Sequence, residues 1–152
     1  MSMDLDEQYN KIYRYCYFKL HQREIAEDIT QETFLRFLES SDYVHTGKAM
    51  QYLYTIARNL CTDEYRKQKT EIMDTEAFDI YVEDNMITRI SVRTALAQLN
   101  ETDRELLLLR YVNEVPVSVI CKLYGISRFA VYRRISQAAK NLKEKLGKED
   151  LT

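Results

Sequence analysis

Hydrophobic residues recur at steps of three and four through the first third of the chain, the spacing that places them on one side of an α-helix. A polar loop at residues 40–46, closed by Gly47, interrupts this pattern. The pattern predicts helices over residues 4–20, 23–39 and 48–69. The residues expected on their apolar sides are Leu5, Tyr9, Ile12, Cys16 and Leu20; then Ile25, Ile29, Phe34, Phe37 and Leu38; then Tyr52, Leu53, Ile56, Ala57 and Leu60. Helices of this kind pack against one another, so residues 1–69 are expected to form one helical domain.

The pattern breaks down over residues 70–86, where six acidic residues occur without a basic one. This segment has no clean helical period, and its apolar residues are too many for a plain spacer. We interpret it as an acidic linker that docks on another surface. Helical spacing resumes near Ile87, and Asn100 to Asp103 is a candidate N-terminal cap for a further helix. Residues 87–152 are therefore expected to form a second small domain.

The end of the chain predicts a helix-turn-helix, the motif that lays a helix in the major groove of DNA. Pro116 suits the first turn of a short helix, and Gly125 can adopt the left-handed conformation that ends it. Ser127 can cap the next helix, which is predicted over residues 128–146. One side of that helix carries Val131, Ile135, Ala138 and Leu142, and the other carries Phe129, Tyr132, Arg133, Ser136 and Lys140.

Composition indicates an all-α, cytoplasmic protein. Three Gly and one Pro among 152 residues provide few residues suited to the tight turns of a β fold. No signal peptide is evident, and no apolar stretch approaches the roughly 20 residues that span a bilayer, so membrane insertion is not expected. The three cysteines are widely spaced, which favours buried free thiols over a redox or metal role. His21 and His45 have no partner at ligand spacing, so we expect no metal and no cofactor.

The net charge of −2 conceals two basic blocks. Residues 48–69 carry five basic and two acidic groups, and residues 122–148 carry eight basic groups against Glu144 alone. Basic blocks separated by an acidic segment are typical of a nucleic-acid-binding protein. Catalysis finds no support, because there is no Ser/His/Asp grouping, glycine-rich phosphate loop or carboxylate pair in an apolar context. We therefore expect a binding protein and not an enzyme.

Two of the predicted helices carry polar stripes that suit binding. The stripe on the second helix is mostly acidic and ends in a leucine, which suits docking on a basic protein surface, although spacing alone favours an ordinary solvated face. The third helix and the loop before it carry groups that can hold phosphates, contact base edges or stack on an unpaired base, although basic helix faces are common. The first stripe consists of Glu24, Asp28, Gln31, Glu32 and Leu35, and the second set of Tyr43, His45, Lys48, Thr55, Arg58, Asn59, Thr62, Arg66 and Lys69.

Three segments, taken in order, resemble conserved regions of the bacterial sigma-70 family of RNA polymerase sigma factors, in its extracytoplasmic-function (ECF) type. Residues 27–34 (EDITQETF) resemble the end of the first conserved region. Residues 52–60 (YLYTIARNL), with Asp63 and Arg66, resemble the promoter-melting helix. Residues 99–142 resemble the promoter-reading domain, and the linker resembles the one that enters the RNA path of the polymerase.

The resemblance implies an alternative sigma factor that binds core RNA polymerase and promoter DNA, with an anti-sigma factor as a further partner in many family members. The stripe on the second helix would dock on the clamp helices of the largest polymerase subunit, which overrides the solvated reading. The third helix and the loop before it would open the minus-ten element and capture one flipped base. The residues concerned are Tyr43, His45, Lys48, Arg58, Asn59, Thr62, Asp63, Arg66 and Lys69. Of these, Asp63 equally suits a structural ion pair. The minus-35 element would be read by Ser127, Arg128, Phe129, Tyr132, Arg133, Ser136 and Lys140.

The chain departs from the family pattern at two places. Val119-Ile120-Cys121 stands where an acidic residue, Ile and Ala are usual, and Ala130 replaces a Thr that would offer a phosphate contact.

Other classes of protein fit part of the sequence pattern. A stand-alone, phage or mobile-element regulator would need the helix at 128–146 but not the acidic stripe, and a dimeric state would favour it. A helical interaction protein without a DNA role, or an ordinary pair of core helices with a solvated basic face, are further alternatives.

Overall fold

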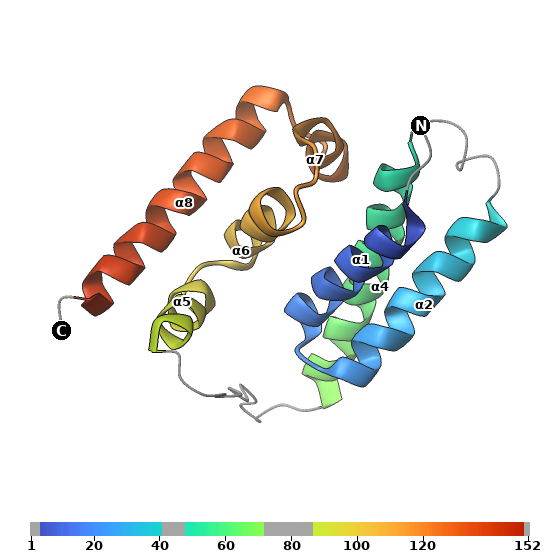
Figure 1. Ribbon diagram of the computed structural model, residues 1–152, viewed down its shortest axis with the longest axis horizontal. Helices are drawn as coiled ribbons and strands as arrows, with labels where there is room; N and C mark the ends of the chain where they lie inside the picture. The colour runs from blue at the N-terminus through green and yellow to red at the C-terminus, as the bar shows by residue number, and fades with distance from the viewer. Residues whose placement is uncertain (1–3, 41–47, 72–86, 151–152) are drawn as a thin grey trace. The chain divides into compact units, whose positions relative to one another are not determined.

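The computed structural model describes residues 4–40, 48–71 and 87–150, and these form helices joined by short turns (Figure 1). The chain divides into two compact units, Met1–Phe78 and Asp79–Thr152. The all-α fold with two helical domains is thereby confirmed. The boundaries at residues 69, 70, 86 and 87 stay a prediction, and most of the proposed linker lies outside the described residues.

Among the described residues of the N-terminal unit, α1 (Leu5–Leu20), α2 (Arg23–Glu39) and α4 (Ala49–Glu71) pack against one another. The side chain of Asp4 caps α1 by accepting hydrogen bonds from the backbone N–H groups of Asp6 and Glu7, at 3.1 and 3.2 Å. His21 ends α1 in the left-handed conformation, with φ 58°, and lets the chain turn into α2. Local capping therefore fixes the limits of α1 that the sequence predicts.

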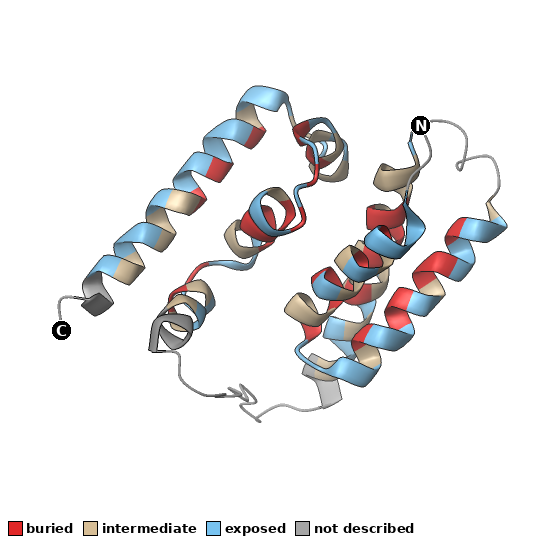
Figure 2. Ribbon diagram, viewed as in Figure 1, coloured by how far each residue is buried: buried red, intermediate tan, exposed pale blue. Residues whose placement is uncertain are grey.

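Small and aromatic side chains make the core between these helices. Cys16, Leu53 and Ala57 are fully buried, and Figure 2 shows the buried residues of each helix on the side facing its neighbours. The rings of Tyr15 and Tyr54 meet edge to face, with centroids 5.7 Å apart, where α1 packs on α4. Both tyrosines are buried, although the sequence analysis placed neither on an apolar side.

Two threonines bring α2 close to its neighbours. Thr30 and Thr33 are fully buried, and each hydroxyl donates to a backbone carbonyl four residues earlier, at 2.7 Å. A hydroxyl satisfied within its own helix can face the core without losing a hydrogen bond. Two leucines that were expected on apolar sides are instead largely exposed: Leu5 by 43% and Leu38 by 55%.

The C-terminal unit consists of α5 (Ile87–Ala97), α6 (Glu101–Leu107), the π-helical turn η1 (Leu108–Val112), α7 (Val117–Tyr124) and α8 (Arg128–Asp150). Asn100 caps α6 by accepting from the N–H of Asp103 at 2.8 Å, as the sequence predicts. The guanidinium of Arg104 donates to the carbonyl of Leu99 at 2.8 Å and ties the end of α5 to α6. Leu107 then packs against α8 in the core of this unit.

A buried carboxylate joins α6 to the helix-turn-helix. Glu105 is 4% exposed and accepts a hydrogen bond from the hydroxyl of Tyr124 at the end of α7. Removing one partner of a buried hydrogen-bonded pair lowers the free energy of unfolding by more than the intact pair contributes to it. This hydrogen bond therefore helps to hold α7 against α6. Pro116 lies one residue earlier than expected, at the N-cap of α7, and Gly125 ends that helix with φ 66° as predicted.

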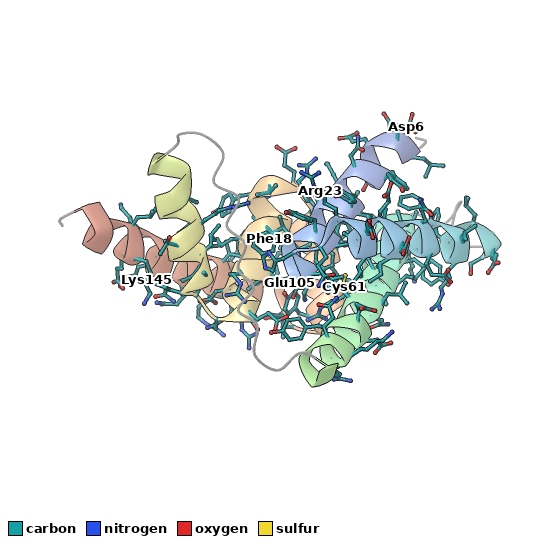
Figure 3. The ribbon with its side chains drawn as sticks, turned by 90° about the horizontal axis from the view of Figure 1, so that it is seen from below. Asp6, Phe18, Arg23, Cys61, Glu105 and Lys145 are labelled. Atoms are coloured by element: carbon teal, nitrogen blue, oxygen red, sulfur yellow. The ribbon has the colours of Figure 1, made fainter. Side chains whose placement is uncertain are left out.

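The three cysteines are free thiols, but only two of them are buried. Cys16 and Cys61 are fully buried between α1 and α4, with Cys61 labelled in Figure 3. Their hydrogen bond lowers the pKa of the Cys16 thiol, as do Thr30 and the charge of Lys19, against the rise that burial causes. Cys121 is only partly buried, because α7 is a short helix packed on one side.

Gly125 and Gly147 give a matched test of the turn, because an added Cβ would meet no atom within 4 Å at either site. Gly125→Ala forces an L residue into the left-handed region and is expected to destabilise the C-terminal unit by about 1–2 kcal/mol. Gly147→Ala lies in α8 and is expected to stabilise that helix, by up to about 1 kcal/mol. Hydrogen exchange of the amides in α7 and α8 measures both changes in stability. A change of the same sign in the two variants would contradict this description of the turn.

Candidate protein and nucleic-acid interfaces

The stripe predicted on α2 lies on the side of that helix away from the core. Glu24, Asp28 and Gln31 are exposed, Leu35 is 58% exposed, and Glu32 is half-buried. Figure 2 shows this outer side of α2 as largely exposed. The structure therefore brings the five predicted residues onto one accessible surface.

Glu32 differs from the other acidic residues of the stripe. Its carboxylate accepts from Nε of Arg36 at 2.9 Å, one helical turn later. This partner was missed in the sequence analysis, although the spacing of four residues on a helix would have indicated it. Within the described part of the chain, no ion pair is recorded for Glu24 or Asp28. These two carboxylates, on the same side of α2 as the exposed Leu35, are the groups best placed to meet a basic partner.

The predicted nucleic-acid surface of α4 is only partly described. Asn59, Asp63 and Arg66 are exposed, and Lys48 is exposed just before the helix. Asp63 forms no recorded ion pair among the described residues, so the structural pairing weighed in the sequence analysis is not observed. Arg58 and Thr62 are half-buried.

The other predicted groups of this surface either form a hydrogen bond within α4 or lie outside the described residues. The hydroxyl of Thr55 donates to the carbonyl of Gln51 at 2.8 Å, which leaves only its lone pairs for another contact. Tyr43 and His45 lie outside the described residues, as does the side chain of Lys69. The flipped-base pocket expected from these groups therefore stays a prediction.

The turn before α8 places the start of that helix firmly. The hydroxyl of Ser127 accepts from the N–H of Ala130 at 3.1 Å, and the backbone carbonyl of Ser127 accepts from Val131 at 2.9 Å. The side chain of Ser127 thus caps the helix, as the sequence predicts. The α8 helix runs to Asp150, beyond the predicted end at residue 146.

Burial separates the two sides of α8 as the periodicity predicts. Val131, Ile135 and Ala138 are buried, and Leu142 is half-buried. Further along, Nδ2 of Asn141 donates to Oδ2 of Asp103 at 3.2 Å and adds a polar tie to α6. The residues expected to read the minus-35 element are all exposed: Ser127, Arg128, Phe129, Tyr132, Arg133, Ser136 and Lys140.

The exposed side of α8 carries uncompensated positive charge. No ion pair is recorded for Arg128, Arg133 or Lys140 in the part of the chain that the structure describes. Lys145, which is labelled in Figure 3, is half-buried and does not belong to this exposed row. Such a row of cations attracts phosphates, and the side chains between them can reach base edges.

The described residues provide neither a membrane-spanning helix nor a cluster of metal ligands. None of the helices there is both long and apolar enough to cross a membrane. No group of three or more His, Cys, Asp or Glu side chains in that part of the chain is arranged to hold a metal ion.

Family models match both units of the chain. Sigma-70 region 2 matches residues 5–71, which contain α1, α2 and α4, and Sigma-70 region 4 matches residues 89–142, which contain the helix-turn-helix. The chain belongs to the sigma-70 family of RNA polymerase sigma factors, in its ECF type.

Individual relatives agree with this assignment. The chain is 28% identical to the ECF RNA polymerase sigma factor BldN of Streptomyces coelicolor, over 90% of this chain and 58% of the relative. It is 28% identical to the ECF RNA polymerase sigma factor SigW of Bacillus subtilis, over 90% and 83% of the two chains. The fold is similar to that of the sigma factor RpoE from Bartonella quintana, solved in complex with the anti-sigma factor NepR, with a TM-score of 0.70, 20% identity and 91% of each chain covered.

The matched regions contain the predicted surfaces. The α2 stripe and the α4 surface fall within region 2, and the side of α8 predicted to contact DNA falls within region 4. The comparisons do not assign roles to single residues, so each residue of these surfaces stays a prediction.

Proposed function

We propose that this sigma factor binds core RNA polymerase through α2, opens the minus-ten element with α4 and reads the minus-35 element with α8. The observation that carries the proposal is the presence of an acidic, leucine-bearing surface on α2 and of a basic, aromatic surface on α8, within a chain matched by sigma-70 regions 2 and 4. Each surface then has its own partner. The place of action is the cytoplasm, where RNA polymerase works.

The α2 surface fits a basic protein partner. Exposed carboxylates at Glu24 and Asp28 provide charge complementarity, which steers association and fixes the orientation of the complex. Leu35 provides apolar area of the kind found at the centre of interfaces. The same carboxylates would repel DNA, so this surface supports polymerase docking and not nucleic-acid binding.

The α4 surface fits DNA that has been opened. Arg66 can hold a phosphate, while the exposed amide of Asn59 can form hydrogen bonds with the edge of an unpaired base. Unstacking a base costs a few kcal/mol, and contacts between the protein and the flipped base offset this cost. Melting therefore requires binding energy alone, and the proposed mechanism involves no covalent step.

The α8 surface fits duplex DNA. The buried side of the helix packs on α6, so the opposite side is free to enter the major groove. Its arginines are suited to bidentate contacts with guanine, and Lys140 is suited to a phosphate. With a net charge of −2, the isolated chain is expected to bind duplex DNA poorly and to rely on polymerase to place α8.

Docking through α2 is tested by the double variant Asp28→Ala/Gln31→Ala. We expect affinity for core RNA polymerase to fall by roughly 2 kcal/mol, about 30-fold, because a charge and an amide are lost from the interface. Co-elution and titration with core polymerase measure this change. The control Asp6→Ala/Asn10→Ala removes a similar exposed pair from α1 and should bind almost normally.

Two results would contradict the docking proposal. One is unchanged affinity of the Asp28→Ala/Gln31→Ala variant with its helical content intact. The other is failure of the wild-type chain to co-elute while it binds duplex DNA tightly alone, which would favour a stand-alone regulator.

Base reading by α8 is tested with Arg133→Ala, with Arg134→Ala as the neighbouring control. Both side chains are exposed, but only Arg133 lies on the side of α8 opposite the core. We expect Arg133→Ala to cost the holoenzyme about 1–3 kcal/mol on its preferred promoter and little on others. Competition binding on matched and mutated duplexes measures this, and an equal loss on every sequence would show that Arg133 holds only phosphate.

A further inference from the structure

Phe129 has the most exposed large hydrophobic side chain in the described part of the chain. Its exposed fraction is 84%, compared with 61% for Tyr111 and 58% for Leu35. Single exposed apolar residues are common, but this ring stands on the DNA-facing side of α8, among cations. Tyr132 follows three residues later and is 47% exposed, so the two rings are neighbours along the helix surface.

The surrounding structure fixes the direction in which Phe129 points. Ser127 caps the helix two residues earlier, and Val131 is fully buried two residues later. With the first turn held at both points, the ring of Phe129 is directed away from the core and forms no recorded ring contact with another described residue. In a helix-turn-helix, residues at the start of the second helix are the ones that meet base edges.

An apolar ring can recognise only one feature of the major groove. The base edges there present hydrogen-bond donors and acceptors, except for the C5 methyl group of thymine. A phenylalanine ring offers neither donor nor acceptor, so a donor or acceptor placed against it would lose its water without compensation. Contact with a methyl group instead removes apolar surface of both partners from water.

We propose that Phe129, with Tyr132 beside it, reads a thymine methyl group in the minus-35 element. Arg133 and Ser136 lie on the same side of α8 and provide hydrogen bonds to neighbouring base pairs. Specificity of α8 then combines polar contacts with one apolar contact. This inference rests on the proposed function, because it assigns a base feature to the same DNA-reading surface.

The test removes only the methyl group. Holoenzyme formed from core RNA polymerase and the full chain selects its preferred sequence from a randomised duplex pool. Each thymine of the selected upstream block is then replaced by deoxyuridine, which keeps base pairing and hydrogen bonding and lacks the methyl group. We expect one replacement to weaken binding about threefold to fivefold, the effect of one buried methyl-sized group.

Variants locate the contact. Phe129→Ala should bind the thymine and deoxyuridine duplexes equally, and Phe129→Leu should retain part of the preference. Tyr111→Ala removes another exposed aromatic side chain of the same unit, from η1, and should keep the full preference. Because Phe129 is almost entirely exposed, its removal should leave the helical content unchanged, which circular dichroism verifies.

The outcomes separate this inference from the proposed function. Selection of an upstream block whose deoxyuridine replacements all bind as well as thymine would overturn methyl reading and leave the sigma-factor function standing. A preference for thymine that survives Phe129→Ala would also overturn it. Selection of no upstream block at all would instead overturn the proposed reading of a minus-35 element.

Discussion

Burial of one side of each helix determines which side is left for a partner. In α8, Val131, Ile135 and Ala138 are buried against the rest of the C-terminal unit, and Phe129, Arg133 and Ser136 are thereby turned outward. Two contacts stabilise the turn that sets the direction of α8: the hydrogen bond from the hydroxyl of Tyr124 to buried Glu105, and the side-chain cap that Ser127 provides. The same constraint acts in α2, where burial of Ala26, Thr30 and Thr33 leaves the acidic stripe outside. Packing thus comes first, and the binding surfaces follow from it.

The distribution of charge is what distinguishes the partners proposed for the two surfaces. A chain with a net charge of −2 has little general attraction for DNA, so in the proposed function the cations of α8 act once another interaction brings them to a promoter. The acidic surface of α2 is suited to provide that interaction through polymerase. In the proposed function both surfaces are needed, one in each unit of the chain.

Much of the fold could be predicted from the sequence because its helices are amphipathic and capped. The limits of α2 agree with its apolar spacing, although no side-chain hydrogen bond caps its start. The caps at Asn100, Gly125 and Ser127 follow from residue types whose local geometry is well defined. The misses have physical causes. Tyr15 and Thr30 carry hydroxyls, which suggest a surface position, yet both are buried, and Thr30 satisfies its hydroxyl within its own helix. The π-helical turn at Leu108–Val112 has no signature in hydrophobic spacing.

The candidate surfaces were predicted unevenly. The outward side of α8 follows directly from its apolar spacing, but the pairing of Glu32 with Arg36 emerged only from the structure. Spacing also could not distinguish the α2 stripe from a solvated face, because both expose carboxylates. The order of three family-like segments favours docking over a solvated face, and the stripe lies within the match to region 2, but the role of its residues stays a prediction.

The most direct test of the central claim is transcription from a promoter library by core RNA polymerase, with and without this chain. If the chain is a promoter-specificity factor, adding it will start RNA synthesis from a defined subset of templates that share two upstream sequence blocks. Transcription that is unchanged by the chain, or that starts without any shared sequence, would contradict the account.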